Sequence, residues 1–330
     1  MYSLSIAAAK RFERFANAVD TEWVTIILAD AGSLFVEDSN ETFAVLQLKS
    51  IRSESETNHL FRVQKELLKV LLIDGQLEID VRDSEVQFTM RGAGGCVRTL
   101  TTEKHQAFTT AFREKFDVIK SASGKVFRAD DLKPMLNVAK AMYSFVEVED
   151  GVAGVMSRSG TLVFREVPDI PNLCLSAQAA SSLFACSTTW YLCKNFVYTL
   201  EDSFGLLVSQ SRGSGLDTYQ ALKTEDTGAA VKVHVDFSNL LSILLKTKGS
   251  TIEYNFRTGE CKSGETGCIY GAIVNQTDLQ VSEKYSKSSV VLNPKVFTNI
   301  IAKLNVMEWD FKVKKHFIQL EADNYTIVCK

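Results

Sequence analysis

Two hydrophobic periodicities alternate along the stretch from Ser289 to Lys330. A short apolar run at 290–292 precedes Asn293, a residue typical of helix N-caps, and Pro294, which is tolerated at the first helical position. Apolar residues then recur at the spacing of one helical face: Val296, Phe297, Ile300, Ile301 and Leu304. Apolar–polar alternation over 309–314 and apolar-rich runs at 317–320 and 325–329 predict three strands. We therefore expect a β-α-β-β-β unit.

The same order of periodicities occurs five more times along the 330-residue chain. The predicted helices span 7–19, 62–72, 132–142, 177–186, 237–248 and 295–304. Asp130 or Asp131 is a candidate N-cap for the third helix, and Asp236 for the fifth. Such a repeat predicts units that bury their apolar faces against one another. Paired in sequence, the units give an α+β fold of three similar domains, at 1–123, 124–224 and 225–330.

The segment from 103 to 124 interrupts this repeat. Its apolar residues Phe108, Phe112, Phe116 and Ile119 are spaced for one face of a helix. We therefore expect a connector that packs on the body of the protein instead of a free linker.

The predicted helices concentrate positive charge on an otherwise acidic protein. The chain carries 37 basic and 40 acidic residues; the six helix ranges hold 12 and two of these, which leaves 25 basic and 38 acidic residues elsewhere. The 12 are Lys10, Arg11, Arg14, Arg62, Lys65, Lys69, Lys133, Lys140, Lys246, Lys248, Lys295 and Lys303. Solvated helix faces often carry lysine, but five of six helices share the bias. This favours a surface that attracts phosphates without reading base sequence.

Composition and motifs give no sign of a catalyst. Apolar content of 45% and charged content of 23% are ordinary for a soluble protein, and no apolar run is long enough for a membrane span. The seven cysteines and four histidines lack metal-ligand spacing. The Gly-Ala-Gly-Gly run at 92–95 is not followed by the Lys and Ser or Thr of a phosphate loop. We predict a protein of the reducing cytosol with no catalytic residue, metal or cofactor.

Three stretches resemble motifs of the DNA polymerase sliding clamps of the bacterial β-clamp type. Residues 157–168 resemble the family's Thr-Asp-Gly-His-Arg-Leu stretch: Leu162 and Pro168 match, and the Asp-Gly-His part does not. Residues 215–222 resemble Gly-x-Phe-Pro-Asp-Tyr-x-x-Val, with Tyr219 kept and Asp217 in place of the proline. Residues 325–330 resemble the terminal strand without its Met-Pro-Met tail. With the six-fold repeat, they indicate a divergent member of the family and suggest a phage origin.

The resemblance implies a DNA-clamp fold in which helices line a central pore and sheets lie outside. Two copies would close head to tail into a homodimeric ring around double-stranded DNA, with the 12 basic residues facing the DNA. Such a ring would serve as a processivity factor that tethers the replicative DNA polymerase and has no catalytic activity of its own. It would work in the cytoplasm of a bacterial cell or of a phage-infected host, away from membranes.

The resemblance also implies a pocket between the second and third domains for short linear peptides from the polymerase and the clamp loader. Carried over residue by residue, the pocket comprises Ser157, Leu162, Asp217, Leu222, Thr326, Ile327 and Val328. The alternative for these residues is ordinary packing at a domain junction. The alternative function is a monomeric clamp-fold scaffold that binds DNA or replication proteins without closing a ring.

Overall fold

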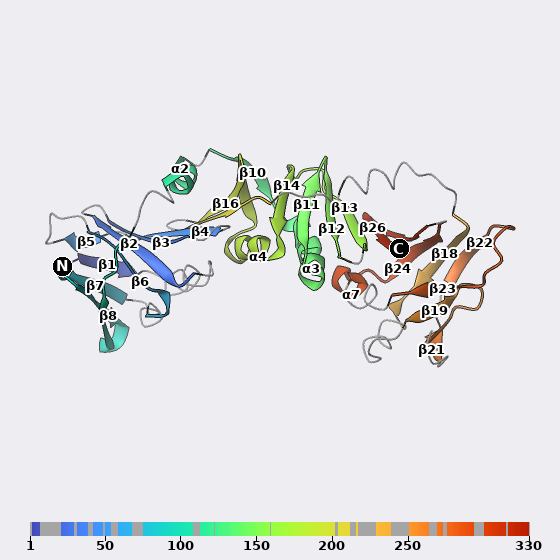
Figure 1. Ribbon diagram of the computed structural model, residues 1–330, viewed down its shortest axis with the longest axis horizontal. Coiled ribbons are helices and arrows are strands. Elements are labelled where there is room, and N and C mark those ends of the chain that lie inside the picture. Colours follow the sequence, from blue (N-terminus) through green and yellow to red (C-terminus); the bar gives the residue numbers. More distant parts are fainter. Residues whose placement is uncertain are drawn as a thin grey trace. The chain divides into compact units, whose positions relative to one another are not determined.

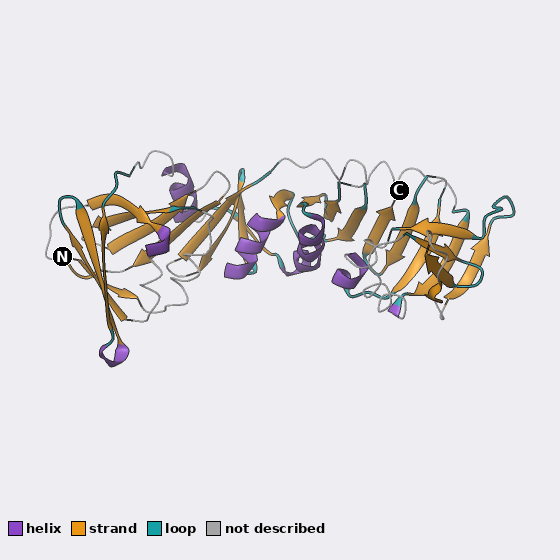
Figure 2. Ribbon diagram, turned by 60° about the horizontal axis from the view of Figure 1, so that its bottom comes forward, coloured by secondary structure: helices purple, strands orange, loops and turns teal. Residues whose placement is uncertain are grey.

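The structure of the chain is a computed structural model, drawn in Figure 1. It describes residues 2–6, 21–29, 32–38, 42–48, 50–53, 59–67, 75–107, 113–121, 123–158, 160–201, 204–211, 216, 229–238, 251–263, 269–272, 276–293, 300–314 and 316–329. Among these residues, strands dominate and helices are few (Figure 2). The chain forms two compact units: residues 1–128 with 179–210, and residues 129–178 with 211–330.

The first unit contains two antiparallel sheets. Eight strands of the larger sheet follow the order β10-β15-β16-β17-β4-β3-β2-β6, and five strands of the smaller follow β5-β1-β7-β8-β9. The larger sheet comprises β2 (Trp23–Ala29), β3 (Gly32–Asp38), β4 (Thr42–Leu48), β6 (His59–Gln64), β10 (Lys125–Arg128), β15 (Thr189–Cys193), β16 (Phe196–Glu201) and β17 (Phe204–Ser209). The smaller comprises β1 (Tyr2–Ile6), β5 (Ser50–Ser53), β7 (Gly75–Val81), β8 (Glu85–Gly92) and β9 (Val97–Glu103), with the 3-10 turn η2 (Ala93–Gly95) before β9.

Helix α2 (Arg113–Ser121) packs on the larger sheet of the first unit. Its Ile119 is buried in a hydrophobic cluster with Phe43, Tyr198 and Leu207, which come from β4, β16 and β17. The predicted packing of the connector is therefore confirmed for α2, whereas Phe108 and Phe112 lie outside the described residues.

The second unit also contains two antiparallel sheets. Nine strands follow the order β14-β11-β12-β13-β26-β25-β24-β18-β22, and four follow β21-β20-β19-β23. The larger sheet comprises β11 (Phe145–Glu149), β12 (Val152–Met156), β13 (Leu162–Glu166), β14 (Leu173–Ser176), β18 (Val231–Asp236), β22 (Gln276–Val281), β24 (Glu308–Val313), β25 (Ile318–Ala322) and β26 (Tyr325–Cys329). The smaller comprises β19 (Ile252–Asn255), β20 (Glu260–Ser263), β21 (Ile269–Ala272) and β23 (Ser289–Leu292).

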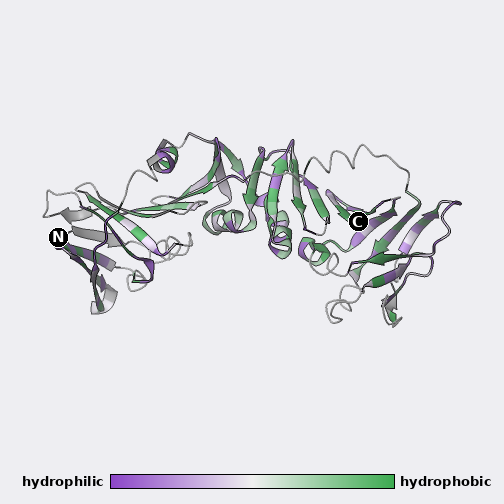
Figure 3. Cartoon of the chain, in the orientation of Figure 1, coloured by the Kyte–Doolittle hydropathy of each residue, from purple (hydrophilic) through white to green (hydrophobic). Residues whose placement is uncertain are grey.

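Besides η2 and α2, the helices among the described residues are η3 (Asp130–Leu132), α3 (Lys133–Met142) and α7 (Ala302–Leu304) in the second unit, and α4 (Ala177–Cys186), of which residues 179–186 belong to the first unit. Figure 3 shows apolar residues, coloured green, recurring along the strands of both units. This distribution fits strands that bury one or both faces.

Strand alternation gives the nine-stranded sheet two different faces. One face, here named the helix face, carries buried Val163 of β13 beside its cross-strand partner Ile327 of β26. Arg165 lies on the same face by alternation and donates to the Asp131 backbone carbonyl at 2.5 Å, so η3 and α3 cover this side. The other face, here named the outer face, carries Leu162 beside Val328.

The predicted C-terminal unit is confirmed in β23, β24, β25 and β26, and the helices predicted at 132–142 and 177–186 are observed as α3 and α4. Of the helix predicted at 295–304, α7 is described. The helix at 7–19 and most of that at 237–248 lie outside the described residues. The Asp236 N-cap is confirmed, since its Oδ1 accepts the Ser238 backbone N–H at 2.8 Å.

Two predictions about helices were wrong. The range 62–72 was predicted as helix, but its start lies in strand β6, because Phe61 and Val63 are buried beside Ile26 and Val24 of β2. A 3-10 turn follows at 65–67, and residues 68–72 lie outside the described residues. No aspartate caps the third helix: the N-caps of η3 and α3 are Ala129 and Leu132, neither with a side-chain cap bond. The Asp131 carboxylate instead pairs with the Arg165 guanidinium at 3.2 Å.

The division into three domains stays a prediction. Two strand pairs join regions on opposite sides of its boundaries: β17 pairs with β4, and β13 pairs with β26. Hydrogen-bonded sheets therefore run across the positions where the sequence places domain borders.

Candidate nucleic-acid interface and partner surface

Helix α3 presents a basic face. Lys133, Asn137 and Lys140 are exposed along one side of the helix, and no residue of α3 is acidic. The opposite side buries Met135, Leu136, Val138 and Ala139. The apolar side of the helix therefore packs on the sheet, and its two ammonium groups lie in solvent.

Helix α7 contacts α3 within the second unit, and Figure 1 draws the two side by side. Lys303 of α7 is exposed, whereas Leu304 is buried. The structure thus places three of the predicted DNA-binding residues, Lys133, Lys140 and Lys303, in solvent on two neighbouring helices.

Arg62 differs from the helix residue that the sequence predicted. It lies on β6, its backbone pairs with His105, and its guanidinium lies 4.7 Å from the centroid of the Trp23 ring. Its Nε is buried without a hydrogen-bond partner. The Arg62 guanidinium therefore interacts with the face of the Trp23 ring, and this interaction within the protein competes with binding of a phosphate.

Lys65 lies in the 3-10 turn after β6 and donates its backbone N–H to the Glu22 carbonyl at 2.8 Å. The other predicted DNA-binding residues lie outside the described part of the chain: Lys10, Arg11, Arg14, Lys69, Lys246, Lys248 and Lys295. The DNA contacts of all twelve residues stay a prediction.

Two residues of the predicted peptide pocket meet in a hydrophobic cluster on the outer face. Leu162 and Val328 are cross-strand partners and pack with Phe164, Leu216 and Phe317; all five are at most 6% exposed. Asp217 and Leu222 lie outside the described residues. Apolar contacts therefore join β13 and β26 at the position where the sequence predicted the pocket. Side chains of this chain itself already cover Leu162 and Val328 there.

Ile327 was wrongly placed in the same wall as Val328. Successive strand residues point to opposite faces, so Ile327 lies beside Val163 on the helix face. Thr326 faces Phe164 across the β13–β26 pair and shares the outer face with Val328. Ser157 closes the turn after β12, because its Oγ accepts the Thr161 N–H at 3.0 Å.

Sequence reasoning missed three members of this cluster: Phe164, Leu216 and Phe317. Phe164 could have been found, because it stands two residues after Leu162 and alternation puts it on the same face. A Cβ on Gly154 would lie 3.0 Å from the Leu216 Cδ2 atom, so Leu216 rests directly on the bare backbone of β12. No local pattern in the sequence signals a contact between residues so far apart.

The outer face is charged over β18, β24 and β25. His234 Nδ1 lies 2.9 Å from Asp310 Oδ1, and His234 Nε2 lies 3.7 Å from Glu308 Oε2. The hydrogen bond to Asp310 raises the pKa of His234 above 6.5, although burial opposes it. Lys312 forms an ion pair with Glu321 on the neighbouring strand. Opposite charges on adjacent strands therefore satisfy one another on this part of the face.

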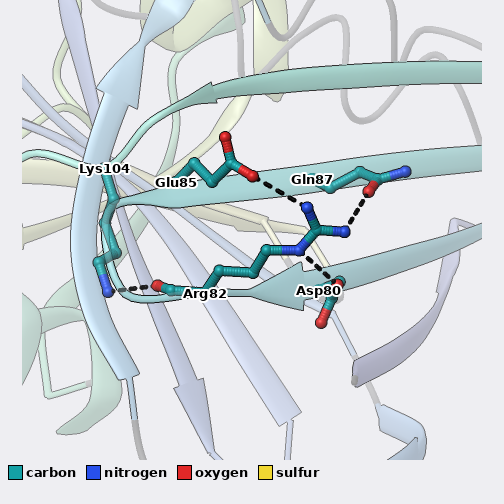
Figure 4. A network of polar contacts seen from close by, with 5 residues as sticks. All are labelled: Asp80, Arg82, Glu85, Gln87 and Lys104. Atoms are coloured by element: carbon teal, nitrogen blue, oxygen red, sulfur yellow. Dashed lines mark hydrogen bonds and ion pairs between the residues drawn. The ribbon is translucent and has the colours of Figure 1, made fainter.

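The smaller sheet of the first unit carries a comparable network (Figure 4). Arg82 donates to Glu85 at 2.9 Å, Asp80 at 3.2 Å and Gln87 at 3.0 Å, and its carbonyl accepts Lys104 Nζ at 2.8 Å. The hydrogen bond to Glu85 is the largest of the interactions that raise the pKa of Arg82. Two carboxylates balance this guanidinium, which makes it a weak candidate for binding phosphate.

Three of the described cysteines are poorly reactive. Burial raises the pKa values of the Cys174, Cys261 and Cys329 thiols to about 12, which keeps them protonated and poor nucleophiles. Within the described residues no cluster of three or more potential ligands could hold a metal ion. None of the described helices has the length and apolar character required to cross a membrane.

No protein-family profile matches the chain, and no curated protein matches it at a significant level. Solved structures do match it. The DNA polymerase III subunit beta from Pseudomonas aeruginosa is 12% identical, with a TM-score of 0.73, and the match covers 100% of this chain and 99% of that one. The DNA polymerase III beta subunit from Thermotoga maritima is 11% identical, with a TM-score of 0.66 and coverage of 100% and 98%. The Helicobacter pylori beta clamp bound to a DNA ligase peptide is 9% identical, with a TM-score of 0.66 and coverage of 99% and 98%. Along its whole length the chain therefore has the α+β fold of the bacterial DNA polymerase sliding clamps.

Proposed function

We propose that this protein is a DNA sliding clamp that encircles duplex DNA and tethers a DNA polymerase as its processivity factor. The observation that carries the proposal is the match of the whole chain, end to end, to structures of DNA polymerase III beta subunits. The exposed lysines of α3 and α7 support it, because a clamp needs cations on its helices and no base-reading side chains.

The binding we propose is topological. A closed ring holds DNA without strong individual contacts, so the lysines need only attract phosphates and can exchange them as the ring moves. Contacts bridged by water suit this role, since a bridging water can replace a direct hydrogen bond at a small entropic cost. The protein would have no catalytic activity, and it would act in the cytoplasm, where the DNA is.

The ring would be a head-to-tail homodimer. β9 ends the smaller sheet of the first unit, and β22 ends the larger sheet of the second. Both strands expose most of their side chains, and within the described part of the chain no strand pairs with their outer edges. Open edges of this kind are templates for pairing with another chain, so each unit offers an edge to a second copy.

The partners would bind through short linear peptides of the polymerase and the clamp loader. The Helicobacter pylori beta clamp binds a peptide of DNA ligase. In the present chain the apolar cluster around Leu162 and Val328 joins β13 and β26 on the outer face, away from α3. A peptide bound there would leave the basic helices free for DNA.

Retention on closed circular DNA tests the proposal. A sliding clamp, once loaded, stays on a nicked circle and is lost when a restriction enzyme linearises it, while light scattering gives twice the chain mass of 36.7 kDa. Equal retention on circular and linear DNA, with a monomeric mass at every concentration, would refute the ring and leave a scaffold that binds DNA through one basic face.

A further inference from the structure

The helix face of the nine-stranded sheet carries a charged side chain within an otherwise apolar surface. Among the described residues of the strands from β14 to β18 in the sheet order, alternation places only one charged residue on this face, Arg165 of β13. Its side chain is 15% exposed. Its cross-strand neighbours are Ala153 of β12 and Tyr325 of β26. An arginine at this position needs an explanation, because burial of a guanidinium is costly.

The Arg165 guanidinium reaches from the sheet to the segment just before α3. Nη1 donates to the Asp131 backbone carbonyl at 2.5 Å, and Nη2 lies 3.2 Å from the Asp131 carboxylate Oδ1. Its Cζ lies 5.2 Å from the centroid of the Tyr325 ring, which is a cation–π contact. Two nitrogens of one planar group thus bind a single residue of η3, a geometry that a lysine ammonium cannot reproduce.

These contacts satisfy the guanidinium only in part. The Asp131 side chain is 67% exposed, so water screens the ion pair. Among the described residues, no group accepts a hydrogen bond from the buried Arg165 Nε. Replacement of a buried ion pair by apolar side chains of similar volume is often neutral or stabilising. Stability alone is therefore a poor explanation for this arginine, and its bonds to η3 point to a role in that segment.

The start of α3 lacks the side-chain cap that commonly fixes a helix N-terminus. The N-caps of η3 and α3 are Ala129 and Leu132, and neither makes a side-chain cap hydrogen bond. Lys133, the first residue of α3, follows Asp131 by two positions and is exposed. Arg165 therefore joins the chain to the sheet immediately before the first lysine of the basic helix.

We propose that Arg165 is a positioning residue for DNA binding: its bond to the Asp131 carbonyl fixes the first turn of α3 and holds the Lys133 ammonium where it attracts a phosphate. This rests on the proposed function, in which α3 faces the DNA. Arg165 itself is a poor candidate for that contact, because its side chain is largely buried and its guanidinium is bound to Asp131. Its effect on DNA binding therefore depends on Lys133.

Charge balance is the competing explanation for the same contact. The Asp131 carboxylate lies two residues before Lys133 and repels phosphates, and an ion pair with Arg165 reduces this repulsion. The variant Asp131→Asn distinguishes the two explanations, because it removes the carboxylate and keeps the backbone carbonyl. If Arg165 acts by position, its loss still weakens DNA binding when residue 131 is neutral.

Fluorescence anisotropy of a duplex blocked at both ends with streptavidin, titrated at several salt concentrations, tests the proposal on the full-length protein. Loss of one phosphate contact lowers the slope of log affinity against log salt by about 1, and this is the decrease per chain that we expect for Arg165→Met. Methionine keeps an unbranched side chain that suits the apolar face. The matched control is Arg82→Met, which removes a guanidinium that carboxylates also bind, in the first unit, and it should leave the slope unchanged.

Double variants show whether the effect depends on Lys133. In the Lys133→Gln background, Arg165→Met should lower the slope no further, because residues that act through one contact are not additive. In the Asp131→Asn background it should still lower the slope by about 1. Arg165→Lys keeps the charge and loses the two-nitrogen geometry, so it should also lower the slope, and it takes the place of Arg165→Met if that variant does not fold.

The possible results separate positioning from stability, from charge balance and from the clamp itself. An unchanged slope for Arg165→Met with a lower unfolding midpoint would overturn the proposal and leave Arg165 as a stabilising contact. An additive loss with Lys133→Gln, or no loss with Asp131→Asn, would also overturn it, the latter in favour of charge balance. An unmodified protein that neither binds the duplex nor stays on circular DNA would overturn the clamp and the positioning role together, whereas retention on circles with an unchanged slope would overturn the positioning role alone.

Discussion

Removal of the two exposed positive charges of α3 should weaken DNA binding and reduce the dependence of the affinity on salt concentration. In the variant Lys133→Gln/Lys140→Gln, two ammonium groups are lost from a face that makes no contact with the apolar core. Each phosphate contact contributes about 0.9 to the slope of log affinity against log salt, so the slope should fall by about 2 per chain and about 4 for a ring of two chains. Per chain, this is a difference of about tenfold in salt response between 50 and 200 mM.

The assay is fluorescence anisotropy of a short duplex whose ends are blocked with streptavidin, titrated at several salt concentrations. The matched control is Lys284→Gln/Lys287→Gln, which removes the same charge from two exposed positions between β22 and β23. Both variants should unfold within about 0.5 kcal/mol of the unmodified protein, because surface changes of this kind seldom alter stability. A slope identical for the two variants would refute the assignment of α3 to the DNA.

Three predictions concern stability. Leu216→Ala should lower the free energy of unfolding by about 2–4 kcal/mol in urea titrations, because it empties the outer-face cluster above Gly154; an unchanged midpoint would contradict that packing. Ile119→Ala should cost a similar amount, about 2–4 kcal/mol, by loosening α2 from the larger sheet of the first unit, and circular dichroism melts would show it. The His234–Asp310 pair should stabilise the protein below pH 6.5 and lose this effect as pH rises through the raised pKa of His234, by less than about 1 kcal/mol at this exposure. Asp310→Asn should reduce this pH dependence and leave the smaller contribution of Glu308, and an undiminished dependence would point to another group.

Hydrophobic periodicity was sufficient to predict the fold, because the pattern that identifies each strand or helix lies within a few neighbouring residues. Trp309, Phe311 and Val313 alternate with charged residues, and this pattern suffices to find β24. The wrong start of the helix predicted at 62–72 is equally local: Phe61 and Val63 are two residues apart, a strand signal, but the spacing of apolar and basic residues over 62–72 favoured a helix. Packing against β2 decided in favour of the strand.

The resemblance predicted only part of the candidate site. The resemblance identified Leu162 and Val328, and the register brings them together, but it also grouped Ile327 with Val328 although neighbouring strand residues point to opposite faces. Leu216 and Phe317 reach the cluster from distant parts of the chain. Such contacts depend on tertiary structure, which no local window of sequence contains.

The strand pairs β17–β4 and β13–β26 limit how the chain can be divided into separable modules. A fragment cut at the predicted borders of the middle domain, 124–224, would lose the partners of both β17 and β13. Each cut would uncover backbone N–H and C=O groups beside apolar residues such as Leu207 and Val163, a combination that favours aggregation. Although the repeat makes the three predicted parts look interchangeable, we therefore expect that a fragment of the middle part alone would not fold as a stable unit.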